Sequence, residues 1–575
     1  MNKKIDKDYS ILIGGAAGLG SRKAGLTIAK LFSEFGYRIF IYDDYQSLIR
    51  GGHNFSHIRA SDRKVLSHRK KIDFLLALDE KTIERHKKNL DKKGMIIYNS
   101  DRISVKDKKA IGIAMGTIVK KAGGIPIMEN TALVAGFAKI IGIDWMTLEK
   151  LLKKEFKKSQ KLSSHTKNLV AGLNLKIARK AFDDTKNLVK IEKLNQKHLP
   201  VLTGNEALSL GAIKAGLDFY IAYPMTPASG ILHYLAAHKE DFNIAVAHLE
   251  NEIGVINAAI GAAFAGVRTM VGTSGGGFAL MTEGLSLAAQ SETPIVIVES
   301  QRAAPATGVP TYTSQGDLLF TLTAGHGDIL KFVIAPGDAD EACFWAGKIL
   351  NLSWKYQTPS ILLIDKEISE STFSFDEGIL NKIECEKPLV WMSSTRHPKR
   401  EKYLRYRDTK NGISPLAFPG QKEAIVKGTS YEHDEYGITV EDEKNVEKMQ
   451  NKRLRKFKEM RKEVERLEAV KIYGKKTAKQ AIIVWGSTKG PAQEAAEALG
   501  IKMIQPIILE PFPEKQLKMA LKGVRELISI ETNALGQLGK VLKGWGIEVD
   551  NEILKYNSRP FLPEEIKQEL KRKLS

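Results

Sequence analysis

The chain has 575 residues, which is too long for a single hydrophobic core, so several domains are expected. Hydrophobic residues make up 43% of the chain and charged residues 27%, and no apolar run reaches the roughly 20 residues that span a bilayer. The N-terminal residues are charged and lack the apolar stretch of a secretory signal. We therefore expect a cytoplasmic protein without a membrane segment.

The formal net charge of +21 is compatible with a nucleic-acid partner, because basic surfaces attract phosphate. However, the lysines alternate with acidic residues in helical stretches such as 150–161 and 452–471, a pattern typical of solvated helix faces that could equally dock an acidic electron carrier. The two cysteines, Cys343 and Cys385, are too few for an iron–sulfur cluster, which needs about four thiolates. Any such cluster must lie on another chain, and we assign no metal ligand here.

Alternating strand-like and amphipathic segments predict an α/β protein with several three-layer domains and largely parallel sheets. The first alternation runs from residue 9 to about 142. The second contains buried-strand candidates at FYIAYP, NIAVAH, RTMVGTS, PIVIVES, KFVIA and PSILLID, and the third contains QAIIVWGS, MIQPIILEP and ELISIET. We expect five regions: a first α/β domain at 1–146, a charged helical linker or domain end at 147–201, a second α/β domain at 202–375, an insert with a long charged helix over 446–475 at 376–475, and a C-terminal α/β domain at 476–575.

A glycine cluster follows the first strand and contains Gly14, Gly15, Gly18 and Gly20. Asp43 and Asp44 come after the next strand, yet the spacing GG-x-x-G-x-G differs from the dinucleotide-binding fingerprint. Two interpretations stay open, a helix terminus that approaches phosphate or a tight turn without a ligand. Downstream, Arg50, Gly51, Gly52 and His53 would by themselves form an exposed turn.

Polar residues follow strands in the second alternation, where open α/β sheets place their ligands. Thr226 lies in the turn YPMTPAS. Glu250 and Glu252 lie at the start of a helix rich in alanine and glycine, where interaction with the positive helix terminus, worth about 0.3 to 1 kcal/mol, is an alternative to a chemical role. At this point the sequence does not decide which of the two glutamates has a chemical role.

The next two strands end in further candidate contacts. Thr273 and Ser274 precede Gly275 and Gly276, a turn typical of an anion or cofactor contact. Arg302 comes directly after a strand, where a guanidinium could clamp a carboxylate through two hydrogen bonds. His326 stands between two glycines, which suits either close approach to a ligand or a simple turn.

Six segments in a fixed order resemble the α subunit of the 2-oxoacid:ferredoxin oxidoreductases: YPMTPAS, ENE, TSGGGF, SQRAAPATGVPT, SQGDLL and GHGD. The first glycine cluster and the RGGH segment resemble the γ subunit of the same family, so the chain looks like a γ–α fusion. The resemblance implies a γ domain at 1–146, a thiamine diphosphate pyrimidine-binding-like domain at 202–375 and a transketolase C-terminal-like domain at 476–575.

The resemblance also implies an enzyme of the EC 1.2.7 class that is active only with a separate β subunit. It would use thiamine diphosphate shared with β, Mg²⁺ and a [4Fe–4S] cluster on β, coenzyme A as cosubstrate and ferredoxin as electron acceptor. The catalytic residue that binds the cofactor pyrimidine would be Glu252, with Glu250 as the rival. The remaining site residues would be Thr273, Ser274, Gly275 and Gly276 for the cofactor, and Thr226 and Arg302 for the 2-oxoacid.

The substrate is expected to be 2-oxoglutarate or a broad set of 2-oxoacids. An indolepyruvate-type or branched-chain 2-oxoacid enzyme is the alternative within the family, because substrate specificity depends on a few pocket side chains. A more distant alternative is a basic dinucleotide-binding or nucleic-acid-binding scaffold, which the first glycine cluster and the charge of +21 suggest. That alternative does not explain the six ordered segments.

Overall fold

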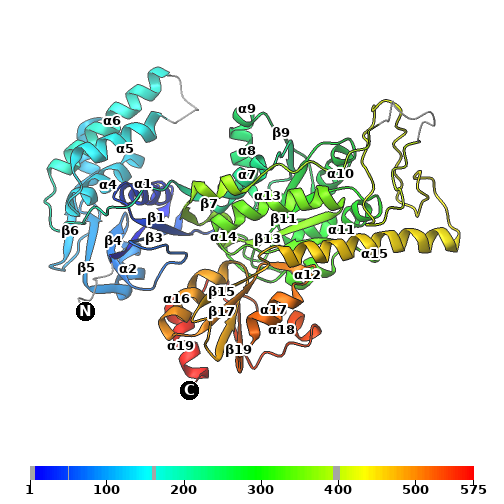
Figure 1. Cartoon of the computed structure of the whole chain (residues 1–575). Helices are drawn as coiled ribbons and strands as arrows, with labels where there is room; N and C mark the ends of the chain where they lie inside the picture. Colours follow the sequence, from blue (N-terminus) through cyan, green and yellow to red (C-terminus); the bar gives the residue numbers. More distant parts are fainter. Residues whose placement is uncertain (1–6, 49–50, 158–163, 393–401, 575) are drawn as a thin grey trace. The chain divides into compact units, whose positions relative to one another are not determined.

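The structure, a computed structural model, describes residues 7–48, 51–157, 164–392 and 402–574 (Figure 1). The chain divides into two compact units. Unit 1 contains Met1–Leu202 with Ser371–Asp376, and unit 2 contains Thr203–Glu370 with Glu377–Ser575. The expected linker region 147–201 therefore belongs to unit 1, whereas most of the second domain, the insert and the C-terminal domain share unit 2.

Unit 1 is built on an eight-stranded sheet. Its strands, in spatial order, are β6 (Ala110–Ile113), β5 (Leu90–Asn99), β4 (Ile72–Ala77), β1 (Asp8–Ala17), β3 (Gly51–Ser61), β2 (Arg38–Asp44), β14 (Thr372–Ser374) and β7 (Val201–Thr203). The strands β1, β4, β5 and β6 are parallel, but β3 is antiparallel to both β1 and β2. The expectation of a parallel sheet in this domain was therefore wrong for β3. Parallel neighbours need a crossover helix between them, and the connection from β2 to β3 is too short to contain one.

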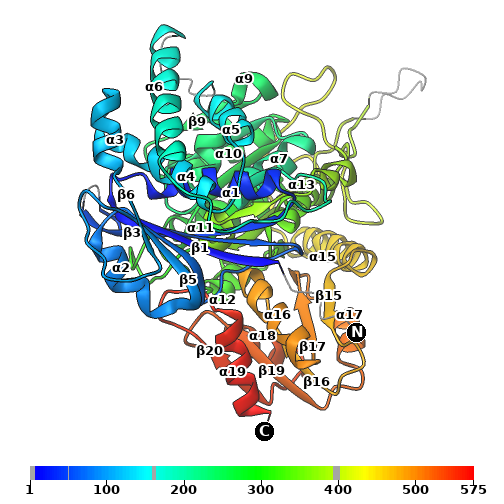
Figure 2. The ribbon, with the colours of Figure 1, turned by 90° about the vertical axis from the view of Figure 1, so that its left-hand side faces the viewer.

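Helices of unit 1 gather on one face of this sheet, as Figure 2 shows. They are α1 (Ser21–Glu34), α4 (Glu129–Ile140), α5 (Trp145–Lys157), α6 (Ser164–Asp183) and the shorter α3 (Met115–Ala122), whereas α2 (Glu80–His86) packs on the opposite face, where its Ile83 joins Leu12 and Leu75. Ile28, Phe32 and Phe137 are fully buried in one core cluster with β1 and β2. Apolar residues from α5 and α6, including Leu148 and Ile177, join the same cluster, so these charged helices are part of the unit 1 core.

Unit 2 contains a seven-stranded sheet that includes all six predicted strands of the second alternation. In spatial order it runs β18 (Ile508–Glu510), β12 (Phe332–Ile334), β13 (Pro359–Asp365), β11 (Ile295–Gln301), β10 (Thr269–Thr273), β8 (Phe219–Ala222) and β9 (Ala245–His248). The strands from β12 to β9 pair in parallel, as expected. Helices of this part include α7 (Gly204–Lys214), α8 (Ser229–Ala237), α10 (Glu252–Phe264), α11 (Gly275–Gln290), α12 (Leu318–Thr323) and α13 (Ala339–Tyr356).

The third sheet has five strands, in the order β15 (Val470–Gly474), β17 (Lys502–Pro506), β16 (Gln480–Ile483), β19 (Glu526–Glu531) and β20 (Asn551–Leu554). The segment predicted as one strand, MIQPIILEP, divides at Ile507. Its first part is β17, and its second part is β18, which pairs antiparallel with β12 at the edge of the seven-stranded sheet. As a result, both sheets of unit 2 contribute to one core cluster, which includes Ile361 and Trp485.

The charged helix predicted over 446–475 is α15 (Glu443–Arg466), the long yellow helix in Figure 1. It ends at Arg466 because the chain then enters β15. Its lysines are not all on a solvated face, since Lys452 and Lys456 are buried and pair with Glu292 at 2.6 and 2.7 Å. Burial lowers the pKa of Lys452 to about 8. Across the described helices, none combines the length and apolar character needed to cross a membrane.

Candidate active site

The candidate site residues lie at the carboxyl ends of β8, β10 and β11, which are parallel neighbours or near neighbours in the seven-stranded sheet. Thr226 lies in the turn after β8, Thr273 is the last residue of β10, and Arg302 comes directly after β11. Because the carboxyl ends of parallel strands share one edge of a sheet, these segments meet there. The predicted residues are therefore brought to one place by the topology.

Glu252 is the first residue of α10, and Asn251 caps this helix by accepting a hydrogen bond from the Gly254 N–H at 2.8 Å. The Glu252 side chain is buried, with 4% of the residue exposed. Its Oε1 atom has no hydrogen-bond partner among the described residues. Glu250, the rival, is exposed. A buried carboxylate oxygen without a hydrogen-bond partner is costly, and this feature distinguishes Glu252 from the exposed Glu250.

The TSGGG turn, residues 273–277, connects β10 with α11. Thr273 and Ser274 are fully buried, and the Ser274 hydroxyl lacks a hydrogen-bond partner in the described part of the chain. A Cβ atom on Gly277 would lie 2.1 Å from Thr273 Oγ1 and 2.6 Å from Glu252 Oε1, so only glycine permits this close packing. A Cβ on Gly276 would meet nothing within 4 Å. The turn thus presents helix-terminal backbone N–H groups next to open space.

Arg302 links the turn after β8 with the rest of the site. Its Nη1 donates a hydrogen bond to the Thr226 carbonyl oxygen at 3.0 Å. Burial lowers the pKa of Arg302, and the nearby Glu252 carboxylate opposes this shift. A guanidinium has five N–H donors, so the bond to Thr226 leaves capacity for an anionic ligand. Thr226, Arg302 and Glu252 are therefore parts of one site.

Two further carboxyl groups, which no sequence motif had identified, lie beside this site. Glu299 is a charged residue inside the buried strand β11, and Asp317 is the N-cap of α12 in the SQGDLL segment. Glu299 is fully buried, and a Cβ on Gly275 would lie 2.7 Å from Asp317 Oδ2. The signal available in the sequence was a glutamate within an otherwise apolar run, PIVIVES.

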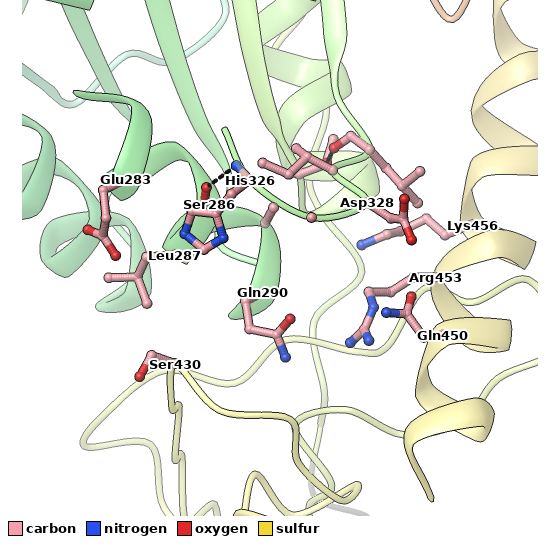
Figure 3. A pocket seen from close by; sticks show the side chains of 15 residues that line it. Glu283, Ser286, Leu287, Gln290, His326, Asp328, Ser430, Gln450, Arg453 and Lys456 are labelled. Atoms are coloured by element: carbon pink, nitrogen blue, oxygen red, sulfur yellow. Dashed lines mark hydrogen bonds between the residues drawn. The ribbon is translucent and has the colours of Figure 1, made fainter. Parts of the chain in front are cut away.

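His326 does not lie with these residues. Its backbone N–H donates to Ser286 Oγ at 3.0 Å (Figure 3). Ser286 follows Gly275 by eleven residues in α11, a separation of about 16 Å at 1.5 Å per residue. His326 lines a separate polar pocket of about 220 Å³. The buried cations of that pocket already have partners, since Arg453 pairs with Glu432 and Lys456 with Glu292.

The first glycine cluster of unit 1 serves packing at two positions. Gly14 and Gly15 lie inside β1, where a Cβ on Gly14 would lie 2.7 Å from a Thr82 carbon. Asp43 pairs with Arg22 at 2.9 Å and accepts a hydrogen bond from Ser56. Of the RGGH segment, Arg50 lies outside the described residues, and His53 is 2% exposed within β3, so the prediction of an exposed turn was wrong at His53.

Two family models match the chain. One, described as pyruvate ferredoxin/flavodoxin oxidoreductase, covers residues 10–183, and the other, described as pyruvate flavodoxin/ferredoxin oxidoreductase, thiamine diphosphate-binding, covers residues 210–452. The 2-oxoacid:ferredoxin oxidoreductase subunit alpha of Saccharolobus solfataricus is 33% identical, over 98% of this chain and 97% of the relative. The chain belongs to the 2-oxoacid:ferredoxin oxidoreductase family.

Other relatives extend this result. The 2-oxoglutarate oxidoreductase subunit KorA of Mycobacterium tuberculosis is 28% identical over 97% of this chain and 90% of the relative. A solved structure of 2-oxoglutarate:ferredoxin oxidoreductase from Magnetococcus marinus, with 2-oxoglutarate, coenzyme A and succinyl-CoA bound, matches with a TM-score of 0.87 and 27% identity. That match covers 99% of this chain and 100% of the other.

The family assignment made from six ordered segments is thereby confirmed, as is the α/β fold with mostly parallel sheets. The chain is an α subunit of a thiamine diphosphate-dependent 2-oxoacid:ferredoxin oxidoreductase, an enzyme of the EC 1.2.7 type. The residues present fit the cofactor. Glu252 has a buried oxygen without a partner, and the turn at Gly276 adjoins open space.

Proposed function

We propose that this chain, together with a separate β subunit, catalyses oxidative decarboxylation of a 2-oxoacid with coenzyme A, producing acyl-CoA, carbon dioxide and reduced ferredoxin. The observation that carries the proposal is the unpartnered Oε1 of buried Glu252, packed against the glycine turn that begins α11. When bound, thiamine diphosphate supplies the electron sink that decarboxylation of a 2-oxoacid requires.

Glu252 is the catalytic residue in this proposal. Its Oε1 would hold a proton in a hydrogen bond to the pyrimidine ring of the cofactor, and burial at a helix N-terminus keeps water from competing for that bond. The hydroxyls of Thr273 and Ser274 and the backbone N–H groups of Gly275 and Gly276 would line the same cofactor pocket. The burial of Thr273 and Ser274 at the end of β10 fixes their hydroxyls before the cofactor arrives.

Arg302 and Thr226 would bind the 2-oxoacid. A guanidinium can bind a carboxylate through two parallel hydrogen bonds, and Arg302 is already oriented by its bond to the Thr226 carbonyl. The Thr226 hydroxyl would then be placed to hydrogen-bond the substrate carbonyl. Leaving these polar groups without a partner would disfavour ligands that lack the 2-oxoacid group.

We assign the diphosphate-binding site, Mg²⁺ and the [4Fe–4S] cluster to the β subunit. The chain has only two cysteines, one of which, Cys343, is buried, and a cluster needs about four thiolates. Electrons would then pass through the β subunit to ferredoxin in two one-electron steps. We also propose a cytoplasmic location, where both cysteines would stay reduced.

The favoured substrate is 2-oxoglutarate, since relatives from M. tuberculosis and Archaeoglobus fulgidus and the M. marinus structure are described by that substrate. A broad specificity is the second candidate, because the relative at 33% identity is described simply by 2-oxoacid. The alternative of a dinucleotide-binding or nucleic-acid-binding scaffold is less well supported than before. Gly14 and Gly15 serve packing inside unit 1, and Asp43 pairs with Arg22.

The test is an assay of the purified complex with its β subunit. Reduction of a viologen dye is measured with coenzyme A and with 2-oxoglutarate, pyruvate or 2-oxoisovalerate. The highest kcat/KM with 2-oxoglutarate would support the favoured substrate, and comparable values with all three acids would support broad specificity. No reduction with any 2-oxoacid would refute the proposed function.

A further inference from the structure

Glu299 and Asp317 are two carboxyl residues that the proposed mechanism does not use. Glu299 is fully buried, and Asp317 is half-buried with its Oδ2 atom out of contact with solvent. In the described part of the chain, neither oxygen of Glu299 nor Oδ2 of Asp317 receives a hydrogen bond from any N–H or O–H group. Glu299 and Gln301 lie on the same face of β11, and the Asp317 N–H donates to Gln301 Oε1 at 3.0 Å, which brings Asp317 beside Glu299. The Asp317 side chain acts on the pKa of Glu299 both as a negative charge and as a hydrogen-bonding partner. Two ionised carboxylates in contact and away from water repel strongly, so such a pair is stable only when it holds a proton.

Among the described residues, the charged groups that act on the pKa of Glu299 are both acidic. Besides Asp317, the charged group that acts on Glu299 is Asp365 at the end of β13, which adds further negative charge. Asp365 itself accepts hydrogen bonds from the Ile368 and Ser487 N–H groups at 3.1 and 3.4 Å. Lys366 follows Asp365 in the chain, but it pairs with Glu370 at 3.9 Å.

The pair is linked both to the glycine turn that begins α11 and to the end of β11 that precedes Arg302. Asp317 lies against Gly275 in the first turn of α11, where a Cβ atom would be 2.7 Å from Asp317 Oδ2. The Asp317 N–H donates to Gln301 Oε1 at 3.0 Å, and the Gln301 amide in turn donates to the Ile364 carbonyl at 3.2 Å. Gln301 directly precedes Arg302. A movement of Asp317 would therefore displace both the glycine turn and the strand end that presents the arginine.

We propose that Glu299 and Asp317 are a proton-sharing carboxyl dyad that positions the active site, in which Glu299 donates the shared proton to Asp317 and Asp317 holds the glycine turn and Gln301. Both are positioning residues, because they act through Gly275 and Gln301. The importance of the contacts with Gly275 and Gln301 for catalysis rests on the proposed function. The existence of the shared proton is independent of that function.

The titration of the pair agrees with this geometry. Burial raises the pKa of Asp317 to about 6, and it raises the pKa of Glu299 well above its ordinary value, with the Asp317 carboxylate adding to the effect. Near neutral pH, Asp317 is thus ionised while Glu299 keeps its proton and donates it. As the pH rises through the pKa of Glu299, the proton is lost, two negative charges face each other, and the pair separates.

The decisive variant is Glu299→Gln in the complex with the β subunit. A glutamine N–H donates to the Asp317 carboxylate at every pH, so kcat at neutral pH should stay within about threefold of wild type. The alkaline decrease of kcat should move to higher pH. The matched variant Glu299→Leu has a similar volume but no donor, and its kcat should fall at least about tenfold. The idea is overturned if both variants behave alike or if Glu299→Gln leaves the pH profile unchanged.

A second measurement does not depend on turnover. The infrared difference spectrum of wild type minus Glu299→Gln, recorded near pH 7.5 in deuterated buffer, should contain the C=O stretch of a protonated carboxylic acid. Asp317→Asn should lower the pKa of Glu299 and weaken the same band. If that band is missing, Glu299 is ionised and the dyad does not exist, whatever the activity. If the band is present in an inactive complex, the dyad stands and the proposed function fails.

Discussion

Replacing Glu252 with glutamine tests the central residue of the proposed site. The change keeps the size of the side chain but removes the carboxylate whose Oε1 has no partner among the described residues. A correctly placed acid or base contributes about 10² to 10⁴-fold to a rate, which corresponds to about 2.7 to 5.4 kcal/mol of activation free energy. We therefore expect kcat for viologen reduction by the α/β complex to fall at least about 100-fold.

The same substitution should not harm folding. A neutral amide is less costly to bury than a carboxylate oxygen without a hydrogen bond, so the melting temperature of the chain without cofactor should be unchanged or higher. Glu250→Gln is the matched control, since Glu250 is exposed two residues away, and its kcat should stay near that of wild type. Retained activity in Glu252→Gln together with a loss in Glu250→Gln would refute the assignment.

Four further substitutions test other contacts. Arg302→Lys should raise the KM for the 2-oxoacid at least about tenfold, since an ammonium cannot form the planar two-bond clamp; an unchanged KM in the viologen assay would contradict this. Gly277→Ala should lower stability by about 1 to 3 kcal/mol, whereas Gly276→Ala should leave the melting temperature unchanged and weaken thiamine diphosphate binding, as thermal unfolding and cofactor titration would show. Glu292→Gln should cost about 3 to 5 kcal/mol in chemical denaturation, because two buried lysines lose their carboxylate; a loss below about 1 kcal/mol would argue against that pair.

The strands of unit 2 were predictable because buried parallel strands are continuous apolar runs that end in glycine or polar turns. The run RTMVGTS became β10, and PIVIVES became β11. Two errors came from strand pairing. The segment MIQPIILEP was divided between two sheets because its second part pairs with β12, and β3 is antiparallel because it pairs with both β1 and β2. Apolar periodicity does not identify these partners.

The sequence predicted which residues lie at the candidate site, but it did not predict the contacts between them. Thr226, Glu252 and Arg302 were identified from the segments that follow strands, but the choice between Glu252 and Glu250 needed their burial, which the structure supplies. Glu299 and Asp317 were missed because one lies in a strand and the other before a helix, and apolar periodicity does not predict the hydrogen bond from the Asp317 N–H to Gln301 Oε1 that links the two segments. The sequence around Lys452 predicted a solvated helix face, whereas its partner Glu292 lies far away in the chain.

The placement of β18 restricts how this polypeptide can be divided. A cut before residue 476 would remove four of the five strands of the third sheet and leave β15 behind. Such a cut would also remove the antiparallel neighbour of β12, leaving the unpaired N–H and C=O groups of that apolar strand exposed to other chains. Exposed edges of this kind promote aggregation. A shortened polypeptide that ends near residue 475 should therefore aggregate, even if the six remaining strands of the seven-stranded sheet fold.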